Sequence, residues 1–89
     1  MQLEDKFINF IVLVLKVAGE KKQNYFVDTI LKFIHDKILL DTDFSIKVLE
    51  SLLKEFKTGK INRWASELLE VFQEIKQIEE REKSKQSLQ

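Results

Sequence analysis

Almost nothing in this chain would interrupt a helix, because its 89 residues include no proline and only two glycines. Proline and glycine are the strongest signals for turns, so few turns are expected and long helices can run without a break. Hydrophobic residues make up 44% of the chain and charged residues 34%, which is a globular rather than a disordered composition. A chain of this length has a modest core, so a partner or a second copy would stabilise it noticeably.

Apolar residues recur at intervals of three and four in four segments, which predicts four helices. The expected ranges are 3–18, 24–40, 44–57 and from about residue 60 onward. The segment FIVLVL in the first range would also suit a buried strand, but the rest of the chain offers no strand to pair with it. The predicted fold class is therefore all-α, either an antiparallel four-helix bundle or a stack of two helical hairpins.

Residues at the ends of these segments predict where the helices begin and end. Gly19 is expected to end the first helix, and Gly59 is expected to adopt the left-handed conformation just after the third. Asn24 is a candidate N-cap for the second helix, and Thr42 or Asp43 for the third.

The last predicted helix carries a heptad-like series of apolar residues. Its members are Ile61, Trp64, Leu68, Val71, Ile75 and Ile78, at intervals of 3, 4, 3, 4 and 3. Such a series is shorter than a confident coiled coil needs. Since the sequence after Ile78 is charged and almost without apolar residues, we predict one helical domain over residues 1–78 and a charged helix end or flexible tail over residues 79–89.

Several motifs that carry chemistry are absent from the sequence. Lys60 follows Gly59, but residue 61 is Ile where a phosphate-binding loop needs Ser or Thr. The segment from Asp41 begins like a calcium loop and then lacks the glycine and the final glutamate that such a loop requires. With no cysteine and a single histidine, His35, the chain has no predicted metal site or cofactor, and we expect it not to be an enzyme.

The apolar run at residues 7–18 fits neither a targeting segment nor a membrane-spanning segment. It is shorter than the roughly 20 apolar residues that cross a bilayer, and the acidic Glu4 and Asp5 precede it where a signal peptide is positively charged. The helix also lacks the rich basic face of a membrane-surface helix. The sequence therefore predicts a cytoplasmic protein that does not bind membranes.

The first helix has more apolar residues than one core face can use. A face containing Phe7, Ile11 and Val14 is expected to point into the core. A further apolar set cannot point the same way and becomes the predicted partner-binding surface, unless the first helix is central: Ile8, Val12, Leu13 and Leu15. A large exposed apolar patch of this kind marks an interface with another protein or with a second copy in a homodimer.

A cluster of basic residues near the single Trp is the other feature that suggests binding. Lys57, Lys60 and Arg63 lie around the turn before the fourth helix, and we expect them to form a polar rim that favours an acidic patch on the partner. The predicted function is a small non-enzymatic protein–protein interaction module, such as a regulatory subunit, adaptor or accessory protein. The alternative is a nucleic-acid-binding accessory protein that uses this turn, although Lys and Arg balance Asp and Glu at 15 each.

Overall fold

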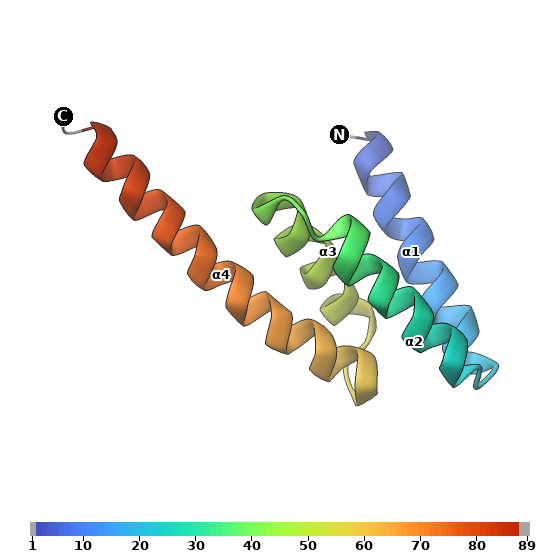
Figure 1. Cartoon of the computed structure of the whole chain (residues 1–89). Helices are drawn as coiled ribbons and strands as arrows, with labels where there is room; N and C mark the ends of the chain where they lie inside the picture. Colours follow the sequence, from blue (N-terminus) through green and yellow to red (C-terminus); the bar gives the residue numbers. More distant parts are fainter. Residues whose placement is uncertain (1, 88–89) are drawn as a thin grey trace. The chain divides into compact units, whose positions relative to one another are not determined.

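The computed structural model describes the backbone of residues 2–87 and the side-chain environments of residues 3–83. This part of the chain is all-helical and contains no strand (Figure 1). The helices are α1 (Gln2–Glu20), α2 (Asn24–Phe33), α3 (Thr42–Glu55) and α4 (Gly59–Ser87), and a short π-helix, η1 (Ile34–Ile38), extends α2. The all-α prediction is confirmed, and the segment that could have been a strand lies within α1.

The chain divides into two compact units, Met1–Leu40 and Asp41–Gln89. Each unit is a helical hairpin: α1 packs against α2 with its η1 extension in the first, and α3 packs against α4 in the second. The sequence predicted one domain over residues 1–78 and no boundary near residue 40. Beyond residue 78, α4 continues as a helix to Ser87, and residues 88–89 lie outside the described part.

The turn of the first hairpin differs from the prediction at Gly19. The helix continues through Glu20, and the left-handed residue is Lys22, with a φ of 58°. The N–H of Lys22 donates to the carbonyl of Gly19 at 3.0 Å, and that of Gln23 donates to the carbonyl of Ala18 at 3.0 Å. These two bonds form a Schellman motif. The motif places the left-handed residue that ends the helix at Lys22, three residues after the glycine that was expected to end it.

The second hairpin is closed by residues near both ends of α3. The N-cap is Asp41, one residue before Thr42 and two before Asp43, the two predicted caps, and its side chain accepts a hydrogen bond from the N–H of Phe44 at 2.9 Å. At the other end, the Asn62 side chain donates to the carbonyl of Phe56 at 2.8 Å. Gly59 has the predicted left-handed φ, 88°, but it is the first residue of α4 rather than the residue after α3. The basic segment is thus an ordered turn between two helices.

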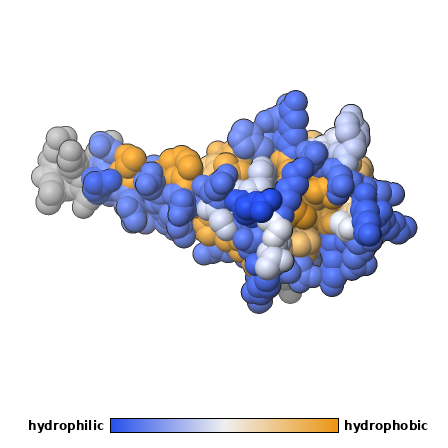
Figure 2. All heavy atoms as spheres, turned by 90° about the horizontal axis from the view of Figure 1, so that it is seen from below, coloured by the Kyte–Doolittle hydropathy of each residue, from blue (hydrophilic) through white to orange (hydrophobic). Residues whose placement is uncertain are grey.

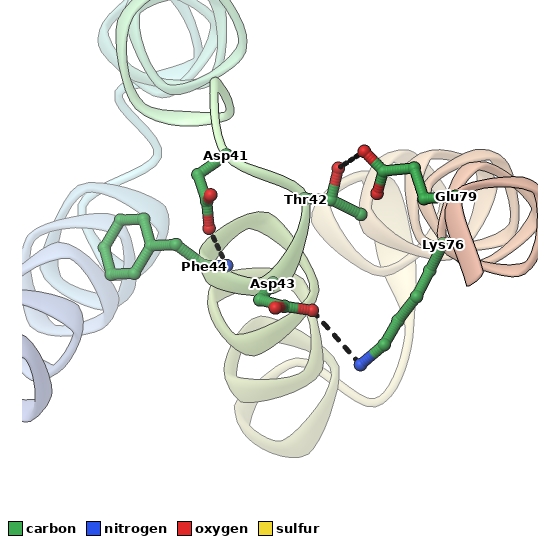
Figure 3. A network of polar contacts seen from close by, with 6 residues as sticks. All are labelled: Asp41, Thr42, Asp43, Phe44, Lys76 and Glu79. Atoms are coloured by element: carbon green, nitrogen blue, oxygen red, sulfur yellow. Dashed lines mark hydrogen bonds and ion pairs between the residues drawn. The ribbon is translucent and has the colours of Figure 1, made fainter. Parts of the chain in front are cut away.

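Polar contacts also join the start of α3 to the middle of α4 (Figure 3). Lys76 Nζ donates to Asp43 Oδ1 at 3.1 Å, and Thr42 Oγ1 donates to Glu79 Oε2 at 3.4 Å. The hydrogen bond to Asp43 is the main cause that raises the pKa of Lys76 above its ordinary value. Because such exposed pairs contribute little free energy, they fix the register of the two helices more than they stabilise the hairpin.

The two glycines are expected to respond in opposite directions to replacement by alanine. Gly19→Ala should raise the free energy of unfolding by about 0.5–1 kcal/mol, because the residue is helical and a Cβ there meets open space. Gly59→Ala should lower it by about 1 kcal/mol or more, because a φ of 88° is strained for alanine. Urea unfolding followed by circular dichroism measures both changes. Equal shifts for the two variants would contradict the assigned backbone conformations.

Candidate functional site

Helix α1 has two neighbouring apolar faces, and only one of them is buried. The buried face follows a 3, 4, 3 spacing and consists of Ile8, Ile11, Leu15 and Ala18. The second face follows a 4, 3, 4, 3 spacing and is exposed or half-buried throughout: Leu3, Phe7, Phe10, Val14 and Val17. Since each spacing matches one side of a helix, the two faces lie side by side along α1.

The exposed apolar face of α1 is largely the one that the sequence assigned to the core. Ile8 and Leu15, two of the predicted contact residues, are almost completely buried and cannot offer a surface to a partner. Val12 is half-buried, and Leu13, at 57% exposed, is the only one of the four that is open to solvent. Periodicity shows that a helix has two apolar faces, but it does not show which of them the rest of the chain covers.

An open apolar groove runs between the exposed face of α1 and the facing side of α2 and η1. Its volume is about 360 Å³. Every lining side chain is apolar: Phe7, Phe10, Ile11 and Val14 from one helix, and Phe26, Ile30, Phe33, Ile34 and Ile38 from the other. Phe10 and Phe33 are 62% and 56% exposed. The hairpin therefore presents aromatic rings to solvent on both walls of the groove.

The π-helix η1 forms the far end of the groove wall. The N–H of Leu39 donates to the carbonyl of Ile34 at 2.9 Å, five residues back rather than four. The buried series accordingly runs Val27, Leu31, Ile34 and then Leu39, with a final interval of five. The extra residue in this turn thus keeps Leu39 on the buried side of the helix.

A second hollow of about 300 Å³ extends the groove toward the turn of the hairpin, because both are lined by Val14 and Phe26. Here the lining includes Lys21 and Gln23. Two further exposed lysines border the groove by helical position, since Lys6 lies four residues before Phe10 and Lys37 four residues after Phe33. Acidic residues border the groove by the same rule: Glu4 lies three residues before Phe7, Glu20 three residues after Val17, and Asp36 three residues after Phe33. The rim of the groove therefore carries charges of both signs.

In the second hairpin, α4 also carries an apolar stripe that α3 does not cover. Ile61 and Ala65 are buried, whereas Val71 and Ile78 are 50% and 51% exposed. The stripe, called here the α4 stripe, has 4, 3, 4, 3 spacing and consists of Trp64, Leu68, Val71, Ile75 and Ile78. Figure 2 shows hydrophobic surface along this helix toward its C-terminal end. In the heptad-like series seen in the sequence, Ile61 is buried, Trp64 and Leu68 are half-buried, and the second half, Val71, Ile75 and Ile78, is exposed.

The charges beside the middle of the α4 stripe are all negative. Between Ala65 and Ile75 the only charged residues are Glu67, Glu70 and Glu74, and all three are exposed. Glu67 and Glu74 lie three residues after Trp64 and Val71, so they border the stripe directly.

The predicted basic rim is exposed but belongs to a different hairpin from the groove. Lys57, Lys60 and Arg63 lie around the α3–α4 turn and are open to solvent. Trp64 is half-buried, which leaves only part of its ring for stacking. All three lie on the unit that does not contain Leu13.

The single histidine contacts its neighbour in the chain. His35 Nδ1 lies 3.0 Å from Asp36 Oδ1 on the exposed side of η1, and this hydrogen bond is the main cause that lowers the pKa of Asp36.

Among the described residues, no group of three or more acidic, histidine or cysteine side chains could hold a metal ion. No helix in the same part of the chain combines the length and the apolar content needed to cross a membrane.

Comparison with known proteins gives no match to this chain, whether by protein family, by curated sequence or by solved structure.

Proposed function

We propose that this chain is a small non-enzymatic protein–protein interaction module whose docking site is the groove between α1 and α2. The observation that supports this most is the groove itself, with exposed phenylalanines on both walls and no polar group in its main hollow. Aromatic side chains dominate the energetics of protein interfaces. An open apolar patch of this kind on a small soluble domain marks an interaction site.

The shape and chemistry of the groove favour a helix as the bound element. Pockets for small molecules combine apolar walls with a few converging polar groups that orient the ligand, and the main hollow has none. An amphipathic helix needs no such groups, because its backbone hydrogen bonds are internal and its apolar residues at i, i+3, i+4 and i+7 fill the groove. Three lysines on the border of the groove, Lys6, Lys21 and Lys37, would favour acidic residues beside those apolar anchors.

Site-specific photo-crosslinking in cells that express the protein tests this proposal. A benzophenone side chain in place of Phe10 lies in the groove, and the same group in place of Tyr25 lies outside it on the same hairpin. We expect a covalent adduct with a polypeptide from position 10 and little or none from position 25. No adduct at either position, or equal adducts at both, would contradict the groove as the docking site.

A further inference from the structure

We propose that the groove of one copy binds the α4 stripe of a second copy, and that the second copy's groove binds the α4 stripe of the first. This proposal rests on the proposed function and names its partner. One chain carries both surfaces, an apolar groove on the first hairpin and an apolar helix face on the second. If two copies exchange these contacts, both surfaces of each chain are covered and the assembly closes on itself.

The two surfaces match in spacing and in length. The exposed face of α1 uses residues 3, 7, 10, 14 and 17, and the α4 stripe uses residues 64, 68, 71, 75 and 78. Both follow 4, 3, 4, 3 intervals, and at 1.5 Å per residue each extends about 21 Å along its helix. Helices with this repeat pack side by side at a small crossing angle. An α4 stripe laid in the groove would thus complete a three-helix arrangement with α1 and α2.

The charges of the two surfaces are complementary in part. Glu67, Glu70 and Glu74 are the only charges along the middle of the α4 stripe. The groove border contains Lys6, Lys21 and Lys37 as well as Glu4, Glu20 and Asp36, and the three lysines are the groups that would meet the glutamates of the α4 stripe. Opposite charges at the border of an apolar contact set the partner and the register more than the affinity.

Pairing of two α4 stripes with each other fits the charges less well. In an antiparallel pair centred on Val71, Glu67 of one copy would face Glu74 of the other, and Lys60 would face Arg81. Both juxtapositions place like charges together. A parallel pair would use the flank that contains Ala65 and Phe72, which is already the more buried side of α4. The charge pattern therefore favours the groove over a second α4 stripe as the site that this helix occupies.

Mixing two variants tests the reciprocal contact directly. Phe10→Asp places a charge in the groove, and Val71→Asp places one in the α4 stripe; both residues are at least half exposed, so folding should survive. Wild type should be a concentration-dependent dimer by sedimentation equilibrium, and each variant alone should dissociate more than about tenfold more readily. An equimolar mixture of the two variants should form a heterodimer, because the intact groove of one can still bind the intact α4 of the other. Tyr25→Asp is the matched control and should dimerise like wild type.

Three results would overturn the proposal. They are a wild type that stays monomeric at every concentration, a Val71→Asp variant that still dimerises, and a mixture that forms no heterodimer although circular dichroism shows both variants folded. If either aspartate variant loses its helix signal, Phe10→Ser and Val71→Ser replace it. If the wild type is monomeric and position 10 crosslinks to a different protein, the self-association is contradicted but the proposed function is not. If no crosslink forms at all, both proposals are contradicted.

Discussion

Replacing Leu15 by alanine will lower the free energy of unfolding by about 3 kcal/mol, whereas the same replacement at Leu13 will change it by less than about 0.5 kcal/mol. Both residues lie on α1 and both were assigned to the same surface by the sequence, yet Leu15 is 0% exposed and Leu13 is 57% exposed. Truncation of a fully buried leucine removes apolar contacts and leaves a cavity. At Leu13 most of the side chain already contacts water.

Urea unfolding monitored by circular dichroism measures this difference, because the two variants delete the same atoms from the same helix. In a domain of this size, 3 kcal/mol corresponds to a fall in melting temperature of about 12–24 °C. Similar losses at both positions would mean that the two faces of α1 are not distinguished as described. A change in the denaturant slope would point instead to an altered unfolded or native state.

Replacing Ala65 by glutamate is the second change with a large expected effect. Ala65 is 0% exposed on the side of α4 that packs against α3. A carboxylate there would have to be buried without a partner or force the two helices apart, at a cost of at least about 3 kcal/mol. Gln73→Glu introduces the same charge at an exposed position of the same helix and should change stability by less than about 0.5 kcal/mol.

Trp64 offers a direct probe for this pair of variants, since it is the single tryptophan and lies next to Ala65. We expect Ala65→Glu to shift the fluorescence-detected unfolding midpoint to much lower urea, with Gln73→Glu close to wild type. A tolerated glutamate at position 65 would show that α3 and α4 do not approach closely there.

The helices themselves were predictable from the sequence, because their periodicity and the scarcity of turn residues act locally. The predictions that were wrong concern where the helices end and which of their faces are buried, which depend on backbone detail and on longer-range packing. Glycine is a residue type that often ends a helix, so Gly19 was predicted to end α1. The Schellman hydrogen bonds instead end the helix around Lys22, which has the left-handed conformation. The cap of α3 is Asp41 rather than Thr42 or Asp43, within a run of three residues that can all cap a helix.

The candidate site could be predicted only in part. The sequence indicated that α1 has too many apolar residues for one face, and that surplus is the exposed face that lines the groove. It did not indicate which face is covered, so Ile8 and Leu15 were assigned to the surface and Phe7 to the core. Which face is buried depends on where the other helices lie, and no pattern within α1 contains that information. The five-residue interval from Ile34 to Leu39 in the buried series is the feature of the sequence that corresponds to η1.

The π-helix also bears on how the length of α2 can change. Across η1 the buried series, Val27, Leu31, Ile34 and Leu39, ends with an interval of five. Loss of one residue between Ile34 and Ile38 would turn this interval into four, and an ordinary α-helix would then carry the same buried face. A deletion earlier in α2 would rotate every later side chain by about 100°. Along α2 and η1, a single-residue deletion is therefore compatible with the same hairpin at η1, and this segment lies at the end of the groove.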